Sequence, residues 1–373
     1  MTNYPFIKPT FLQALAASGS VGRNTGWLPE HISIEKDGQT LAYMPTYRKD
    51  HSWGEYVFDW AWANAYQRHN LHYYPKLVSA IPFSPATGPR VRFADGVDQP
   101  TLCAQLISQV IDHAHQIDAS SWHLLFPDAS TLANFKHPQL MQRDGVQFHW
   151  FNRGYQCFDD FLATFVSRKR KMVRRERQRI IAQDIAVQML KGADIDAELW
   201  AFFFHLYQTT YLKRSGGGGY LTADFFLRLG QTMPDDIVMA VASRDGRRIA
   251  CALYFHDTST LYGRYWGCIE EYDCLHFELC YYSGIDYAIA NGLQKFDAGA
   301  QGEHKVLRGF EPVATHSLHW IKHPGFAEAI AKFVADERRD NARYIANARS
   351  VLPYRQEISA GSTAHIPATG PTD

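Results

Sequence analysis

The sequence predicts an α/β fold with mixed, largely antiparallel sheets, arranged in two tandem units. The chain has 373 residues, which is more than a single hydrophobic core usually supports. Segments in which apolar and polar residues alternate, as in strands, are interspersed with segments of helical spacing. A hydrophobic content of 46% and an aromatic content of 14% supply enough apolar surface for complete cores.

Composition excludes several classes of function. Lys plus Arg and Asp plus Glu both number 38, so no global electrostatic field draws the chain to nucleic acid or membrane, and any electrostatic function must be local. The six cysteines are scattered without a Cys-x-x-Cys pair, which favours a reducing compartment. No basic segment followed by an apolar core opens the chain, and no stretch is apolar for long enough to span a bilayer. We therefore expect a cytoplasmic protein.

The first predicted unit covers residues 1–155. Asp37-Gly38 is a turn signal inside a predicted β-hairpin at 31–49. The other expected elements are a helix at 10–20, a strand at 76–81, a helix at 100–116, and strands at 122–126 and 147–151.

Two segments of this unit allow both a functional and a structural interpretation. Six aromatic residues at 53–69 could form a substrate wall, but a core or an interface is the commoner use of such residues. Three prolines, one glycine and two arginines at 82–93 make a rigid loop. That loop could hold a phosphate, although a structural corner is favoured.

The second predicted unit, residues 156–322, begins with a strongly basic helix at 161–183. Eight Lys or Arg residues fall within twelve positions, among them Arg170, Arg174 and Arg175, and only Glu176 relieves their repulsion. A solvated surface helix is the alternative, but six of the eight are arginine, which favours bidentate phosphate contacts. We therefore expect an anionic, phosphate-bearing partner, such as a small-molecule diphosphate, a lipid-linked diphosphate or tRNA.

The rest of the second unit continues the α/β pattern. Four glycines at 216–219 form either a mobile anion-binding lid or a plain linker. His276 and Glu278 fall in the first turns of a helix that is apolar on most sides, so Glu278 is either a structural acceptor or an active-site acid or base. The expected elements are strands at 185–190, 237–243, 247–256, 260–268, 293–297 and 315–321, and helices at 193–214, 222–232 and 273–291. After the second unit we expect a surface helix within 323–355 and a disordered tail at 356–373.

The segment 296–312 is the densest in reactive groups. It follows a predicted strand, and the ends of strands are where α/β sheets usually expose their chemistry. Its candidate site residues are Asp297, Gln301, Glu303, His304, Lys305 and Arg308.

The order of elements in 185–321 resembles the GNAT acyltransferase fold, and residues 10–151 resemble a second, more divergent copy. A doubled GNAT unit with a basic helix resembles the FemAB-like family of peptidoglycan biosynthesis or recognition proteins. The segments that carry the resemblance are 261–268, 275–282, and 299–305 with 308–310. It implies transfer of an aminoacyl group from aminoacyl-tRNA to an amine of a cell-wall precursor, whereas GNAT enzymes use acyl-CoA.

One segment departs from the GNAT pattern. GNAT enzymes usually carry a Gln/Arg-x-x-Gly-x-Gly/Ala loop that holds the pyrophosphate of CoA at a helix N-terminus. Here residues 267–274 contain three acids and no such glycine pattern. The departure weakens the case for acyl-CoA, so no cofactor is firmly predicted, and it leaves the basic helix as the better anion site.

The chemistry of acyl transfer assigns candidate roles. An amine nucleophile must lose a proton, and the carbonyl oxygen must be stabilised as charge develops. Glu278, Asp297 or Glu303 could be the base, and His304 could carry protons. The candidates for substrate binding are His276, Gln301, Lys305, Arg308, Arg170, Arg174 and Arg175.

Each of these roles has a structural alternative. Asp297 and Glu303 could simply pair with Lys305 and Arg308 to hold the loop. The seventeen histidines include no His-x-x-x-His with a matching carboxylate helix, so we predict no metal site. For the whole protein, the main hypothesis is an acyl or aminoacyl transferase that acts on an amine. The alternative is a non-catalytic module that binds a phosphorylated or cell-wall ligand.

Overall fold

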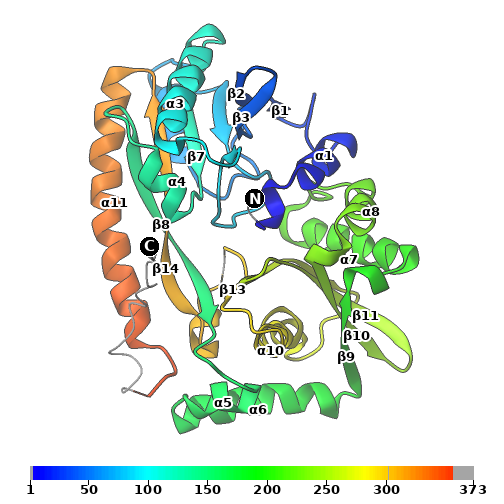
Figure 1. Ribbon diagram of the computed structural model, residues 1–373. Coiled ribbons are helices and arrows are strands. Elements are labelled where there is room, and N and C mark those ends of the chain that lie inside the picture. The colour runs from blue at the N-terminus through cyan, green and yellow to red at the C-terminus, as the bar shows by residue number, and fades with distance from the viewer. Residues whose placement is uncertain (1–2, 301, 356–373) are drawn as a thin grey trace, which may run out of the picture.

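A computed structural model describes residues 3–300 and 302–355 (Figure 1). The predicted tail at 356–373 and the candidate Gln301 lie outside the described residues. The helices of the first half are η1 (Pro5–Ile7), α1 (Pro9–Ala17), α2 (Trp60–Arg68), α3 (Gln99–Gln116) and α4 (Ala129–Asn134). Its strands are β1 (Trp27–Pro29), β2 (Ile32–Lys36), β3 (Gln39–Met44), β4 (Tyr47–Lys49), β5 (Lys76–Ser79), β6 (Arg92–Phe93), β7 (Ser121–Leu125) and β8 (Met141–Phe151).

The second half begins with two helices and ends with a long one. Its helices are α5 (Phe158–Ala163), α6 (Ser167–Ala182), η2 (Gly192–Asp194), α7 (Ala197–Ser215), α8 (Ala223–Thr232), η3 (Pro234–Asp236), α9 (Leu275–Phe277), η4 (Glu278–Tyr282), α10 (Ser283–Ala290), η5 (Glu303–Arg308) and α11 (Pro324–Ser350). Its strands are β9 (Ile185–Lys191), β10 (Ile237–Arg244), β11 (Arg247–His256), β12 (Thr260–Cys268), β13 (Lys295–Asp297) and β14 (Glu311–Ile321).

Eleven of the strands form one continuous sheet. Their order is β1-β4-β5-β7-β14-β8-β13-β12-β11-β10-β9, while β2, β3 and β6 form a separate small sheet. Within the large sheet β5 with β7 and β12 with β13 are parallel, and the other neighbours are antiparallel. The predicted α/β class with a mixed, largely antiparallel sheet is confirmed.

The strand directions are symmetric about the central pair of β14 and β8. From this pair outward, β7, β5 and β4 on one side repeat the antiparallel, parallel, antiparallel pattern of β13, β12 and β11 on the other. β8 belongs to the first half of the chain and pairs with β13, whereas β14 belongs to the second and pairs with β7. The division at residues 155 and 322 stays a prediction, but the last strand of each predicted unit pairs with a strand of the other.

Two predicted helices are interrupted or distorted in the structure. The basic helix predicted at 161–183 is two helices, because Phe165 is buried in an extended link that bridges to Tyr354, and Val166 N–H donates to the Pro353 carbonyl. The helix predicted at 273–291 begins at Leu275 and contains the π-helical turn η4, a distortion that is frequent at functional sites. Cys274, with φ of 67°, occupies the N-cap position of this helix.

Several helices pack directly against the large sheet. α11 lies along β8 and β14 at one side of the molecule, and η4 and α10 pack against strands from β10 to β13 (Figure 1). The rigid loop at 82–93 is a structural corner, as expected: Arg90 is buried and donates to the carbonyl oxygens of Leu125, Gly88 and Pro89.

Candidate active site

A cavity of about 550 Å³ lies where β12 and β13 diverge. The two strands pair only through Thr260–Tyr262 and Lys295–Asp297. Beyond these residues β12 continues along β11 to Cys268, whereas the chain after β13 turns away into the loop 298–302. In the described part of the chain, the edge of β12 from Gly263 onward therefore has no strand partner on the side of β13. Gly263 to Trp266 and Ala298 to Ala300 line the cavity that this leaves.

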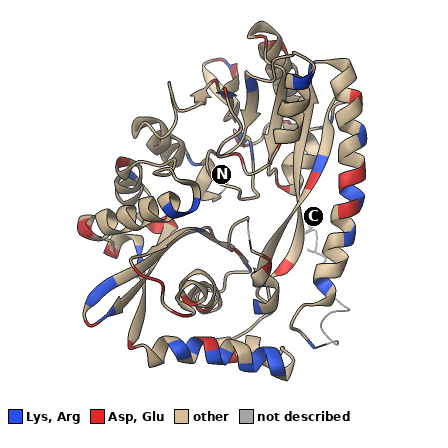
Figure 2. Ribbon diagram, turned by 180° about the vertical axis from the view of Figure 1, so that it is seen from behind, with Lys and Arg blue, Asp and Glu red and all other residues tan. Residues whose placement is uncertain are grey.

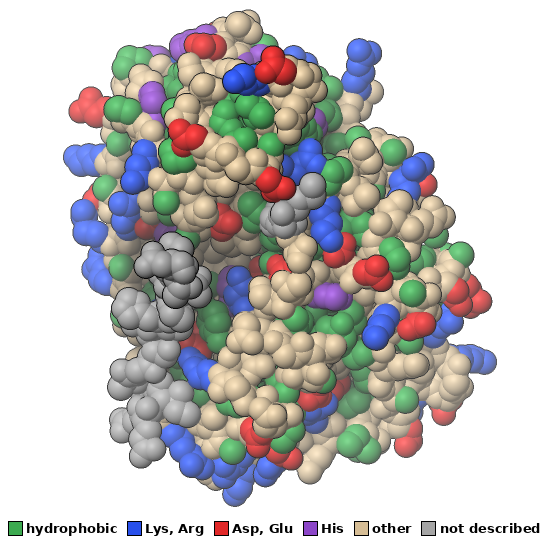
Figure 3. Space-filling view, in the orientation of Figure 1, with side chains coloured by type: hydrophobic (Ala, Val, Ile, Leu, Met, Phe, Trp, Pro, Cys, Tyr) green, Lys and Arg blue, Asp and Glu red, His purple; other side chains and the backbone are tan. Residues whose placement is uncertain are grey.

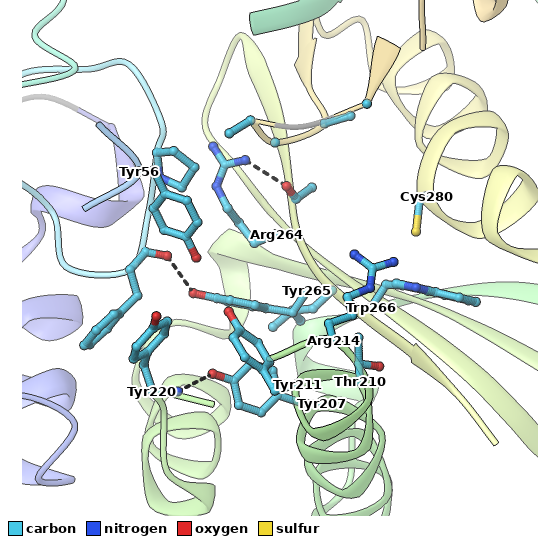
Figure 4. A pocket seen from close by; sticks show the side chains of 18 of the residues that line it. Tyr56, Tyr207, Thr210, Tyr211, Arg214, Tyr220, Arg264, Tyr265, Trp266 and Cys280 are labelled. Carbon is cyan, nitrogen blue, oxygen red and sulfur yellow. Dashed lines mark hydrogen bonds between the residues drawn. The ribbon is translucent and has the colours of Figure 1, made fainter. Parts of the chain in front are cut away.

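Aromatic side chains form much of the cavity wall (Figure 4). They come from the segment 53–60, the loop at Phe83, α7 and the loop after it, β11, β12 and η4, and are Trp53, Tyr56, Phe58, Trp60, Phe83, Tyr207, Tyr211, Tyr220, Tyr254, Tyr265, Trp266 and Tyr281. The expectation that residues 53–69 serve mainly as core was wrong for the first four aromatics, which line the cavity. It is confirmed for Trp62 and Tyr66, which are buried. No Asp or Glu is among the described lining residues.

Two arginines reach the cavity, and one of them is already paired. Arg264 Nη2 lies 2.8 Å from Asp297 Oδ2, and both side chains are buried. Burial raises the pKa of Asp297, but the charge of Arg264 outweighs it and holds this pKa well below the usual carboxyl range. Asp297 also accepts the Gly299 N–H at 2.9 Å, so the carboxylate orients the loop. Arg214, at the end of α7, has no ion-pair partner among the described residues.

Lys305 also holds the loop that follows Asp297. It is buried and donates from Nζ to the Gly299 carbonyl oxygen at 2.6 Å. Burial lowers the pKa of Lys305 from its ordinary value of 10.5 to about 8, although the charge of Asp297 opposes this shift. The lysine is not among the residues that line the cavity.

The lowered pKa of Lys305 predicts a pH dependence of stability. Between about pH 8 and pH 10.5 the unfolded chain binds more protons at this site than the folded chain, so the free energy of unfolding should rise with pH. In Lys305→Met this contribution is absent and the rise should be smaller. Urea denaturation of both proteins across this pH range measures the difference. Parallel profiles would contradict the assignment.

His304 and Tyr281 form a polar pair at the cavity wall. His304 Nε2 lies 2.7 Å from Tyr281 Oη, and both residues line the cavity. Partial burial, followed by the charges of Arg308, Lys305 and Arg214, lowers the pKa of His304, so the ring is neutral at pH 7. A neutral imidazole beside a phenol can accept a proton and return it.

His276 completes this corner of the cavity. Its ring packs edge-on against Trp266 and Tyr281, with centroid distances of 5.1 and 5.4 Å. Burial, followed by interaction with the neighbouring His304 ring and with the charge of Arg214, lowers the pKa of His276 to about 3, so this ring is a neutral part of the wall.

Three other candidates face away from the cavity. Glu278 Oε1 accepts from Arg177 of α6 at 2.9 Å, and burial raises the pKa of Glu278 despite this partner. Glu303 Oε1 accepts from Tyr344 of α11 at 2.7 Å.

Arg308 is also held elsewhere. Its Nη2 lies 2.7 Å from Glu176 Oε1, and its guanidinium lies 3.4 Å from the ring centroid of Phe277. Asp297 and Glu303 thus have Arg264 and Tyr344 as partners, and not the Lys305 and Arg308 pairing that the sequence allowed.

The basic-helix candidates Arg170, Arg174 and Arg175 lie on α6, on the far side of η4 from the cavity. None of them lines the cavity, and Arg174 Nη2 is 2.8 Å from Asp159 Oδ1. The structure thus brings together His276, His304 and the loop after Asp297, and keeps the cations of α6 apart from them.

Sequence reasoning missed Tyr281, Arg264 and most of the tyrosine wall. Arg264 carried a usable signal, because an arginine within a buried strand needs an anionic partner. Tyr281 gave no such signal, since it is one of several apolar and aromatic residues on a buried helix.

A second cavity of about 260 Å³ adjoins the first. It lies among β8, β14 and α11, and its polar lining residues include Arg143, Asp144 and His316. Tyr56, Phe58 and Ala300 line both cavities, so these residues form the wall between them.

Neither a metal cluster nor a membrane-spanning helix is found in residues 3–300 and 302–355. No three His, Cys, Asp or Glu side chains gather there as metal ligands. None of the described helices combines the length and the apolar character needed to cross a bilayer.

Two parallel strands that part at a cavity, within a large mixed sheet, define the class of fold to which the protein belongs. The chain belongs to the FemAB-like family, described as peptidoglycan biosynthesis/recognition, whose model matches residues 1–356. The predicted family is confirmed. A search among curated proteins gave no match.

Solved structures share the fold at low sequence identity. L-PGS from Bacillus licheniformis is 13% identical, with a TM-score of 0.52, over 88% of this chain and 97% of that chain. The C-terminal domain of a protein assigned as a lysylphosphatidylglycerol synthetase from Agrobacterium fabrum is 12% identical, with a TM-score of 0.50, over 87% and 96%. FemX is 13% identical, with a TM-score of 0.49, over 87% and 93%. At these identities the likeness shows the fold alone.

Proposed function

We propose that the protein transfers an acyl or aminoacyl group to an amine acceptor in the cavity between β12 and β13, with His304 as the base. The observation that carries the proposal is the pair of His304 and Tyr281 at the wall of this cavity. Membership of the FemAB-like family supports a cell-wall-related acceptor, and the name of one structural neighbour, a lysylphosphatidylglycerol synthetase, supports an acceptor on a lipid.

In the proposed reaction the acceptor amine attacks the carbonyl carbon of the donor. A new C–N bond forms, and the amine proton passes to His304, directly or through Tyr281. Backbone N–H groups on the unpaired edge of β12 stabilise the oxygen as it becomes negative. The bond from carbonyl carbon to leaving group then breaks, and protonated His304 returns the proton to the departing oxygen or sulfur. Arg214 holds an anionic group of either substrate.

The lining of the cavity favours a neutral acyl group. A cationic side chain on the acyl group would lose its hydration in the cavity. It would find no carboxylate partner there, because no Asp or Glu is among the described lining residues. Aromatic walls instead suit apolar or aromatic groups. We expect donors with a neutral aliphatic or aromatic acyl group to react at least about tenfold faster than lysyl or arginyl donors. A tenfold ratio corresponds to about 1.4 kcal/mol, which lies within the cost of leaving one buried polar group unpaired.

The experiment is a transfer assay with two kinds of donor. Purified protein is incubated with a set of acyl-CoAs and, separately, with a set of aminoacyl-tRNAs, each with amine acceptors that include lipid-linked cell-wall precursors and aminated lipids. Mass spectrometry then detects the amide product. A product from either donor type supports the proposal and names the donor. Tight binding of a donor or acceptor without any product would instead favour the non-catalytic binding module.

A further inference from the structure

The outward face of α6 is a continuous basic surface. Its outward residues, which we call the α6 surface, are Arg168, Lys171, Arg174, Arg175, Gln178 and Arg179, all exposed. Glu176, the acid of this helix, lies on the inward side, where it pairs with Arg308. Figure 2 shows the cations along this helix, at the lower edge of the molecule, and Figure 3 shows basic side chains gathered at the same edge.

The inward face of α6 fixes the direction in which these cations point. Val173 and Ile180 are buried, and Arg177 bridges Glu278 and Asp286 at 2.9 and 2.8 Å. The helix is therefore held by apolar contacts and by ion pairs of its inward residues. The α6 surface is not needed for that anchoring.

Few carboxylates offset the charge of the α6 surface. Arg174 pairs with Asp159 and Arg179 with Asp273, but at least half of each of these side chains is exposed, and such pairs contribute little. Within residues 3–300 and 302–355, Arg168, Lys171 and Arg175 have no ion-pair partner. An uncompensated row of cations attracts an anionic partner.

Exposed apolar side chains flank this row. Ile181, near the end of α6, is 74% exposed, and Val166, just before its start, is 42% exposed. Val351 is 56% exposed and follows the end of α11, close to Val166, whose N–H donates to the Pro353 carbonyl at 2.8 Å. Large apolar side chains that border a basic strip suit a partner that combines anionic groups with an apolar interior.

The shape of the surface separates the candidate partners. It lies on the outside of a helix, and none of its residues lines either cavity described above, so it does not enclose a small phosphate. A nucleic-acid backbone would satisfy the cations but would leave Ile181 in water. A bilayer with anionic headgroups satisfies both, since Lys and Arg remain among the headgroups while apolar side chains enter the acyl boundary.

We propose that the α6 surface docks the protein onto an anionic lipid bilayer. This proposal is independent of the transfer reaction, because it uses no residue of the catalytic cavity. Docking would bring an enzyme of this family to the surface where a lipid-bound acceptor is found.

Vesicle flotation tests the proposal with the full-length protein. We expect binding to vesicles of phosphatidylglycerol mixed with phosphatidylcholine, little binding to phosphatidylcholine alone, and release by high salt. The double variant Lys171→Glu with Arg175→Glu should partition at least about 25-fold more weakly, because each basic residue near an anionic surface contributes about a fivefold factor. Circular dichroism confirms that the variant is folded, and Lys171→Gln with Arg175→Gln replaces it if it is not.

The matched control is Arg339→Glu with Arg343→Glu on α11, which has the same i,i+4 spacing and exposed side chains. This control should bind vesicles as the unmodified protein does. Ile181→Ser should weaken vesicle binding without changing binding to RNA. Equal binding to neutral and anionic vesicles, or equal loss in the α11 control, would overturn the proposal. Salt-sensitive binding to tRNA without binding to anionic vesicles would assign the α6 surface to nucleic acid.

Discussion

Replacing His304 by alanine should lower the rate of acyl transfer about 10²- to 10⁴-fold, the usual contribution of a positioned general base. His304 is the neutral imidazole of the cavity that lies 2.7 Å from a hydroxyl group, so its loss removes the acceptor for the amine proton. The rate constant is measured at saturating donor with the substrates found by the transfer assay. Tyr281→Phe should have a smaller effect, because it leaves the imidazole in place.

Glu303→Gln distinguishes the two neighbouring candidates for the base. Glu303 is hydrogen-bonded to Tyr344 of α11, so we expect this variant to keep most of its activity. If Glu303→Gln is as slow as His304→Ala, the carboxylate has a part in the reaction and the assignment to His304 fails. Thermal unfolding of both variants separates a catalytic defect from a loss of structure.

The rate of transfer should also fall at acidic pH. Because burial and nearby cations lower the pKa of His304 below 6.5, the base is fully available at pH 7. The rate constant should therefore fall only as the pH drops below 6.5. In His304→Ala the residual rate should not show this fall, and a profile that is the same in both proteins would rule out His304 as the titrating group.

Replacing Arg264 by methionine should lower the free energy of unfolding by about 3 to 5 kcal/mol. The change leaves Asp297 buried without its cation, and breaking a buried ion pair on one side carries a penalty of this size. Urea denaturation at pH 7 measures the loss. The double variant Arg264→Met with Asp297→Asn removes both charges and should recover a large part of it.

Acid provides a second test of the pair. In the unmodified protein Asp297 has a lowered pKa, so its contribution to stability is complete above the ordinary value of 3.8 and is lost as the pH falls. Without Arg264, burial raises the pKa of Asp297, and protonation then favours the folded state. The deficit of Arg264→Met should therefore shrink on acidification. A deficit that stays constant with pH would show that it arises from lost packing.

The local pattern predicted most elements but not how they are combined. The meander of β10 to β12 and the hairpin of β2 and β3 follow from alternating residues and turn signals. The pairing of β14 with β7 joins residues almost 200 positions apart, and no local pattern specifies such a partner.

The candidate site shows the same limit. His304 was predicted from the reactive residues around it, whereas its partner Tyr281 looks like any other residue of a buried helix. The basic helix was predicted from charge alone. Its separation from the cavity was not, because spacing shows which residues share a face of a helix but not what that face meets.

The central pair of β8 and β14 limits how far the two halves of the molecule can move apart. Nine residue pairs join these two strands, and each strand is also paired with the other half of the molecule. The two halves are therefore joined by strand pairing, and a hinge motion that separates them would have to break the pairing of β8 with β14. Substrates must enter past loops and side chains. For the same reason, a fragment that ends near residue 155 and a fragment that begins there should each fold only in the presence of the other.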